Sequence, residues 1–226
     1  GEWTTTRQVS IGELAHLLYA TGNLQGVTTF LHALNEDGTP ACASPGPVYS
    51  TPNTQGVFIA VYTFDGCLVD LNVIPNTVGG ELDAQSVYVS EYVGGGFNNR
   101  IYQIYRRKAA MGAPNTVYVR ALEKDYSGGS LDLVDVWTTP YTYVSSMNAE
   151  ALEMSVYKRK IFFTGYFERD FIYGSGIMVA PPGSSDAMVC ALKDNGTAPV
   201  EIFNKELYTA GNVHRAKGYG IASDAG

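Results

Sequence analysis

The chain has 226 residues and a mass of 24.4 kDa, a size typical of one domain, and its 45% hydrophobic residues are enough for a full core. The net charge of −7 and the isoelectric point of about 4.9 argue against tight RNA binding, because gripping a polyanion requires a strong positive field. No apolar run approaches the roughly 20 residues that span a bilayer, so we expect no membrane span.

The first predicted element is a short helix near the amino terminus. Residues 10–13, Ser-Ile-Gly-Glu, have the form of a capping box, in which Ser10 would satisfy an amide of the first turn. Four apolar residues then recur at helical spacing, namely Ile11, Leu14, Leu17 and Leu18. We expect this helix to end near Gly22 and to contact another subunit or its own sheet.

The next segment, residues 35–55, is rich in Asn, Asp, Gly, Pro, Ser and Thr, which indicates an extended connection. Residues 56–64 are apolar, and their periodicity is compatible with either a buried helix or a strand. A turn at Asp65-Gly66 follows. In residues 67–74, Cys67, Val69, Leu71 and Val73 alternate with a set that includes the polar residues Asp70 and Asn72. This alternation is expected of a strand that ends at Pro75.

Further short runs with Gly or Pro between them predict more strands, at residues 86–93, 100–106, 116–122, 131–137, 156–163 and 171–179. In 131–137 the alternation changes phase, which indicates a bulge or a strand buried on both faces. Long helices do not alternate with these runs, so a parallel doubly wound sheet is excluded. Seven strands at this spacing predict an antiparallel sandwich or barrel.

We find no constellation of catalytic or metal-binding residues in the sequence. The three histidines, His16, His32 and His214, have no partner at a recognised metal spacing. Three cysteines, Cys42, Cys67 and Cys190, lie far apart and form no CxxC pair, which argues against a disulfide framework and a zinc site and favours folding in a reducing cytosol. We therefore expect no catalytic residue, no metal and no cofactor.

Other motifs have plain structural interpretations. Residues 94–96 are three glycines without the flanking sequence of a phosphate loop, so they indicate a hairpin connection. Two basic clusters, 106–108 and 158–160, are flanked by aromatic residues; we favour an interface over contact with RNA. In the second cluster, strand alternation would place Lys158 and Lys160 on one face and Arg159 on the other.

Two stretches resemble the capsid proteins of picorna-like viruses, particularly those of dicistroviruses, iflaviruses and marnaviruses. Gly1-Glu2 and residues 9–14 are similar to the segment that leads into the subunit around the five-fold axes, although Gly12 replaces the usual Arg. Beginning at Gly1 without Met fits cleavage from a longer precursor, although an engineered start or missing first residues would look the same.

The second stretch, Arg169 to Pro182, resembles the Asp-Asp-Phe motif, apolar strand and Pro-Pro ending of the same subunit. Weaker similarities lie between the two, at residues 57–73 and 136–141. In relatives the Asp-Asp-Phe motif is associated with maturation cleavage. Here only Asp170 and Phe171 match, because Arg169 takes the place of the first Asp. Glu168 and Asp170 are close in sequence, but no third residue beside them completes a catalytic group. An Arg beside Asp170 would hold the carboxylate ionised, so we assign no cleavage activity.

The resemblance implies an all-β, antiparallel jelly-roll sandwich of about eight strands, with short helices and a long N-terminal arm. It divides the chain into an arm with a helix (1–55), a jelly-roll core (56–182) and a C-terminal extension (183–226). The implied function is that of a structural capsid protein of a small icosahedral positive-strand RNA virus, assembled in the host cytoplasm and found in the virion. Its implied partners are other capsid subunits, further copies around the five-fold axes and the enclosed RNA, contacted weakly; the host receptor is unknown.

The alternative is a phage tail component or a lectin-like module, since Tyr-rich loops on a sandwich also suit glycan recognition. An enzyme is the third possibility.

Overall fold

The computed structural model describes residues 3–12, 16–29, 39, 42, 48–77, 79–90, 100–110, 113–137, 140–174, 176–207 and 215–223. These residues form fifteen β-strands in three sheets, every strand pair is antiparallel, and none of these residues is helical. The predicted all-β antiparallel fold is therefore confirmed, although the strands are nearly twice as many as the eight expected.

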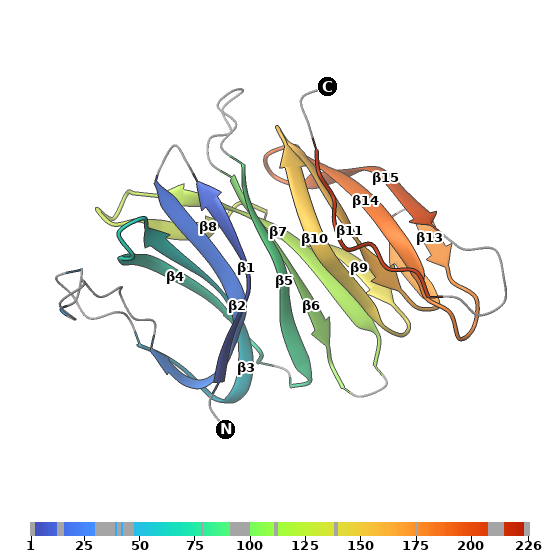
Figure 1. The fold of residues 1–226 in the computed structure, drawn as a ribbon, viewed down its shortest axis with the longest axis horizontal. Coiled ribbons are helices and arrows are strands. Elements are labelled where there is room, and N and C mark those ends of the chain that lie inside the picture. Colours follow the sequence, from blue (N-terminus) through green and yellow to red (C-terminus); the bar gives the residue numbers. More distant parts are fainter. Residues whose placement is uncertain are drawn as a thin grey trace.

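The three sheets lie side by side, with the green strands of the middle sheet between the other two (Figure 1). The first sheet has the order β1 (Trp3–Gly12), β2 (Leu17–Thr29), β3 (Val48–Thr63) and β4 (Leu68–Pro75). The middle sheet has the order β13 (Gly176–Val179), β12 (Asp170–Tyr173), β9 (Tyr141–Ser145), β7 (Asn115–Asp125), β6 (Arg100–Lys108) and β5 (Glu81–Ser90), with β8 (Asp132–Asp135) paired to β7. The third sheet has the order β10 (Ala149–Tyr157), β11 (Lys160–Phe167), β14 (Asp186–Asp194) and β15 (Pro199–Leu207).

The middle sheet is buried on both faces over β6 and β7. Alternate side chains of a strand point to opposite faces. On β6, Ile101 packs with residues of the first sheet, whereas Tyr102 and Ile104 belong to the core shared with the third sheet. This double burial explains why the apolar residues of these strands are nearly continuous instead of alternating.

A buried polar network lies between the first and middle sheets. Arg120 on β7 is 3% exposed and donates hydrogen bonds to Gln103 (2.8 Å) and Asn72 (2.8 Å). Gln103 in turn donates to Thr21 (2.7 Å), and Asp135 lies 3.4 Å from the Arg120 guanidinium. Burial lowers the pKa of Arg120 from its ordinary value, because desolvation disfavours the charged form. The network links strands from both sheets in one register.

The edge of the middle sheet at β5 is covered by side chains of the first sheet. Four amides along β5 donate hydrogen bonds to side-chain oxygens, two on either side of a bulge after Ala84. The pairs are Leu82 with Gln55, Ala84 with Asn23, Val87 with Gln8, and Val89 with Ser10. Side chains thus take the place of a neighbouring strand, which satisfies buried amides and blocks further strand pairing.

The predicted N-terminal helix is wrong. Residues 3–12 and 17–29 form an antiparallel pair, with Ile11 opposite Leu18, and residues 13–15, including Leu14, lie outside the described ranges. Ser10 accepts a hydrogen bond from the β5 amide of Val89 instead of capping a helix. Gly22 does not end a helix but lies in β2, where a Cβ would be 2.8 Å or less from the backbone of Thr5.

Two predicted strands are each a hairpin. Residues 156–163 contain the turn between β10 and β11, with Tyr157 opposite Lys160 and Lys158 at a φ of 56°. Lys158 and Lys160 therefore do not share the face of one continuous strand, which corrects the expectation for this basic cluster. Residues 171–179 likewise contain both β12 and β13.

The other predicted segments keep their strand character with different bounds. Residues 56–64 belong to the strand β3 and not to a helix. The boundary expected at 55/56 lies within β3, and β14 and β15 follow residue 182 as members of the third sheet. The glycines at 94–96 lie outside the described residues.

The structure contains a disulfide bond between Cys42 and Cys67, with the two Cα atoms 5.7 Å apart. The expectation of no disulfide is therefore wrong. It relied on the 25-residue sequence separation of the pair, but the fold closes that distance. Cys190 is a buried free thiol on β14.

Replacing Arg120 with Met should destabilise the fold by about 3 kcal/mol, because Gln103 and Asn72 would lose their buried donor. The control is Arg7→Met, which removes an ion pair to Asp83 from an arginine that is 53% exposed and should change stability by under about 1 kcal/mol. Urea unfolding followed by fluorescence measures both. Equal losses in the two variants would contradict a structural role for the network.

Replacing Cys42 and Cys67 together with Ser should lower the free energy of unfolding by about 3 kcal/mol, the loop-entropy estimate for a loop of this length. A reducing agent should lower the stability of the native chain by a similar amount and leave the double variant unchanged. Guanidinium unfolding with and without reductant tests this. A native chain that is insensitive to reductant would contradict it.

Candidate functional site

Strand β15 at the edge of the third sheet turns three polar residues inward and leaves apolar residues, together with Lys205, on its outward side. The side chains of Glu201, Asn204 and Glu206 are directed toward the middle sheet and its β12–β13 hairpin. Tyr141 donates a hydrogen bond to Glu201, and the Tyr143 hydroxyl lies 3.4 Å from the Asn204 carboxamide oxygen. Val200, Phe203 and Leu207 lie on the outward face, with exposed fractions of 50%, 37% and 53%. An edge strand that merely covered a core would have the reverse pattern.

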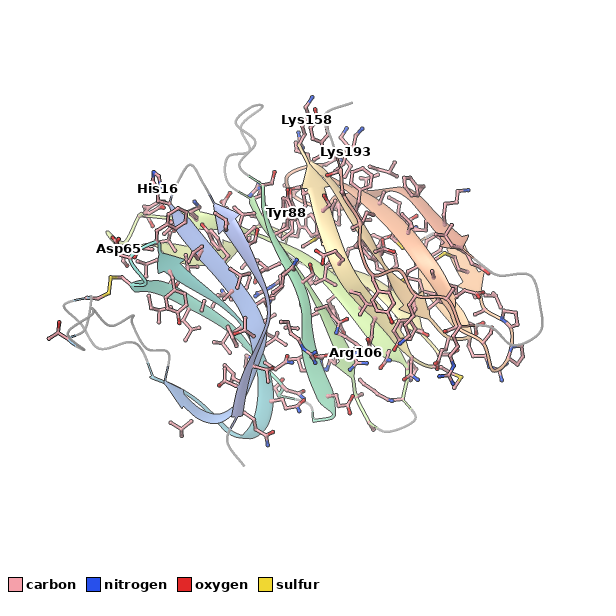
Figure 2. The ribbon with its side chains drawn as sticks, in the orientation of Figure 1. His16, Asp65, Tyr88, Arg106, Lys158 and Lys193 are labelled. Carbon is pink, nitrogen blue, oxygen red and sulfur yellow. A yellow bond between two sulfur atoms is a disulfide. The ribbon has the colours of Figure 1, made fainter. Side chains whose placement is uncertain are left out.

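The strand register shows which side chains share this outward face. Val200 lies beside Lys193, which is directly opposite Lys160. The next row contains Phe203 and Phe162, whose ring centroids are 6.5 Å apart. We call this surface the lysine-rimmed face and define it by Lys160, Lys193, Lys205, Phe162, Val189, Val200, Phe203 and Leu207. Figure 2 labels Lys193 and the neighbouring turn residue Lys158 at one end of these strands.

The segment 215–223 covers the rest of the outer face of the third sheet. The Gly218 amide donates to the Gly165 carbonyl at 3.0 Å, and the Lys217 ammonium lies 4.1 Å from the centre of the Tyr166 ring. Farther along, Ser223 contacts Ser155 on β10. The parts of β10 and β11 near Ser155 and Tyr166 are thus covered by the chain itself, whereas Val200, Phe203 and Leu207 of β15 remain exposed.

A second exposed apolar surface lies on the β12–β13 hairpin. Ile172, Ile177 and Val179 are each about half exposed, whereas Phe171 and Met178 between them are buried in the main core. This hairpin and β15 are held together because the carboxylate of Glu206 accepts a hydrogen bond from the backbone of Val179. Both apolar surfaces therefore lie at the same end of the molecule (Figure 1).

The inward side of β15 contains a pair of carboxyl groups. Glu206 lies beside Asp186 on β14, which is 3% exposed. Burial, followed by a hydrogen bond to Asp186 and the negative charge of that residue, raises the pKa of Glu206 above its ordinary value. The two groups can share a proton, which holds β15 against β14 most firmly when Glu206 is protonated.

The opposite end of the molecule is acidic. A cleft of about 610 Å³ lies between β4 and the β7–β8 hairpin, and three carboxylates line it, those of Asp70, Asp125 and Asp132. Desolvation raises the pKa of Asp70, and the charge of Asp132 adds to the effect. Two large apolar side chains, Phe64 and Tyr126, are 51% and 59% exposed at this end.

We define the acidic end by Phe64, Asp65, Asp70, Glu123, Asp125, Tyr126, Asp132 and Asp135. Two of its carboxylates also form ion pairs with arginines of the middle sheet, Glu123 with Arg100 and Asp135 with Arg120. Asp65 and His16 are labelled on this side of Figure 2, at a distance from Lys193.

The structure separates the basic clusters found in the sequence. Arg106 lies among three carboxylates, those of Glu81, Asp83 and Glu150, at 3.1 to 3.7 Å. The Arg159 guanidinium donates to the backbone carbonyl of Asp194. Cluster 158–160 borders the lysine-rimmed face. The other lysines of that face, Lys193 and Lys205, could not be found from the sequence, because they lie on strands distant in sequence from the cluster.

The remaining candidate residues that the structure describes lie in separate parts of the chain. His16 stands in a turn and packs its ring against Phe64, whereas His32 and His214 lie outside the described residues. Burial raises the pKa of the Cys190 thiol well above its ordinary value, which disfavours the nucleophilic thiolate. Arg169 occupies a turn with a φ of 63°, and its carbonyl accepts from Ala180, while Glu168 accepts from Asn148.

Within the described ranges, no three or more His, Cys, Asp and Glu side chains are arranged to hold a metal ion. The same residues include no helix with the length and apolar content needed to cross a membrane. Comparison with protein-family models, curated proteins and solved structures finds no match.

Replacing Glu206 with Gln should make stability less dependent on pH. The raised pKa of Glu206 means that its protonated form stabilises the fold at low pH, and this contribution is lost as pH rises from 4.5 through the raised value. The neutral amide should retain the contact with Asp186 at pH 7 and raise the melting temperature there. Thermal melts between pH 4 and 8 measure the difference. A native chain whose stability increases over the same range, with no gain in the variant, would contradict the assignment.

Proposed function

We propose that this chain is a structural subunit that acts by assembling with neighbouring subunits, without catalysis, and that the assembly is the shell of a small icosahedral RNA virus. The observation that carries the proposal is the inverted pattern of β15. Glu201, Asn204 and Glu206 turn inward, and Val200, Phe203 and Leu207 are left on the outside. Exposed contiguous apolar surface on a folded chain marks an interaction site.

The three-sheet architecture supports this role. A sheet that is packed on both faces and fixed in register by buried hydrogen bonds is a rigid support for flat contact surfaces. Shell subunits need such surfaces because many weak contacts, repeated by symmetry, sum to a stable particle. Sister capsid chains and further copies of this chain are the proposed partners, and the enclosed RNA is contacted weakly.

The jelly-roll form of the proposal has partial support. A jelly roll consists of two Greek keys, in which a strand returns to lie beside one three positions earlier. Two pairings here join strands three positions apart, β12 with β9 and β14 with β11, although the two strands between each pair lie in the other sheet. The first sheet, in contrast, contains only neighbours in sequence, so the proposal depends on surfaces more than on strand order.

The disulfide affects where the proposed subunit matures. Disulfides are rare in a reducing cytosol. If the chain folds in the host cytoplasm, Cys42 and Cys67 would be joined only when the particle reaches oxidising conditions, as the virion does outside the cell.

The alternative function is glycan binding by a phage tail component or lectin-like module. Electron microscopy of the chain, expressed together with candidate sister subunits, tests the choice. We expect closed symmetric particles that contain the chain. Particles that lack it, together with saturable binding of the isolated chain on a glycan array, would contradict the proposal and favour the alternative.

A further inference from the structure

We infer that the lysine-rimmed face binds the acidic end of a second copy of this chain, in a head-to-tail contact between two different surfaces. The inference rests on the proposed function, for which it names one partner and one contact. The two surfaces lie at opposite ends of the longest axis, β14 and β15 at one end and β4 and β8 at the other (Figure 1).

The first argument is charge complementarity. The chain has a net charge of −7, yet the ionisable side chains that define the outward rows of β14 and β15 are lysines, Lys193 and Lys205, joined by Lys160 on β11. The carboxylates of β15 point inward instead. The acidic end has six carboxylates, of which Glu123 and Asp135 are already paired with Arg100 and Arg120, and Lys124 beside them lies over the ring of Tyr19. Opposite potentials of this kind steer and orient association.

Each of the two surfaces also carries like charges close together, which lowers the stability of the unassociated chain. Lys160 and Lys193 are directly opposite each other on adjacent strands, an arrangement that is destabilising. At the other end, the charge of Asp132 helps to raise the pKa of Asp70. Contact between the surfaces relieves both repulsions at once, because each charge then faces one of opposite sign.

The third argument is the apolar content of both surfaces. Val200, Phe203 and Leu207 lie between or beside the lysines, and Phe64 and Tyr126 lie beside the carboxylates. An apolar centre with a charged rim is the usual composition of a protein interface. Single-stranded RNA is the other polyanion to consider, but its bases need open aromatic faces. On the lysine-rimmed face the Phe162 and Phe203 rings lie 6.5 Å apart, centre to centre, and the other apolar members, Val189, Val200 and Leu207, are aliphatic.

A head-to-tail contact has a consequence for assembly. Because the two surfaces differ, each copy retains one unused surface after pairing, so the contact continues into a ring or a filament and does not stop at a dimer. This property leads to a test that a symmetric dimer cannot pass.

Two charge-reversed variants provide the test. The first is Lys160→Glu with Lys193→Glu, which destroys the lysine-rimmed face. The second is Asp65→Lys with Asp132→Lys, which alters the acidic end without touching Asp135, the partner of buried Arg120. Sedimentation equilibrium in about 50 mM and 500 mM salt measures association; at low salt each variant alone should have a dissociation constant at least about tenfold above that of the native chain.

An equimolar mixture of the two variants should form one-to-one dimers and nothing larger, since each variant supplies the surface that the other lacks. Dimer formation also shows that both variants are folded. A control, Lys108→Glu with Arg169→Glu, changes the net charge as much as the first variant does but lies outside both surfaces, and it should associate as the native chain does.

Several outcomes would overturn the inference. These are a native chain that stays monomeric at low salt, variants that associate normally, or a mixture that stays monomeric while the native chain associates. Binding of polyuridine RNA at sub-micromolar affinity that the lysine variant loses, with self-association unchanged, would assign the face to RNA. If the variants still enter closed particles with the sister subunits, the inference fails and the proposed function stands; if the native chain enters no particle, the proposed function fails.

Discussion

The fold depends on one constraint, the burial of both faces of the middle sheet. A sheet packed on both faces has no solvent-facing side for its polar groups, so each polar residue on it needs a partner inside the protein. The strands meet this constraint at Arg120 and Gln103, which bond to each other and to Asn72 and Thr21 of the first sheet. At the opposite interface, the buried carboxylate of Asp194 accepts from Tyr102 and Trp137. Both networks link strands that are distant in sequence, so they also select the register.

The same constraint explains the contrast between the two outer edges. β5 lies between the first and third sheets, so the amides on its unpaired edge are buried. Side chains such as Gln8 and Asn23 accept hydrogen bonds from these amides, which would otherwise have no partner. β15 lies on the outside, where water satisfies a free edge, so no covering residues are needed there. The molecule therefore closes one edge completely and leaves apolar side chains on the other, and this asymmetry is the physical basis for the proposed assembly role.

The acidic net charge is also distributed unevenly. Positive groups such as Arg106 and Arg120 are enclosed by carboxylates or buried, whereas the lysines of β14 and β15 stand apart from the carboxylates of their own strands. A protein that repels its own copies through its overall charge can still associate through oriented surfaces, because screening limits the repulsion to about 10 Å at moderate salt. Association would then be specific to orientation and sensitive to ionic strength.

The sequence by itself determined the class of the fold and the approximate positions of most strands in its middle. Frequent Gly and Pro and alternating apolar residues are local properties, and they are sufficient to identify antiparallel strands such as β4 and β7. Two errors arose where local signals are ambiguous: Ser10 and Ile11 fit a helix cap as well as an edge strand, and Lys158-Arg159 interrupts a run without Gly or Pro.

Only the tertiary structure decided which surfaces exist. The lysine-rimmed face draws on β11, β14 and β15, and the acidic end on β4, β7 and β8, so neither forms a run in the chain. The Cys42–Cys67 bond has the same origin, since two cysteines 25 residues apart become neighbours only when the chain folds. Periodicity reports the face of a strand on which a residue lies, but not whether that face meets a core, another chain or water. That depends on the packing of whole sheets, which is a non-local property.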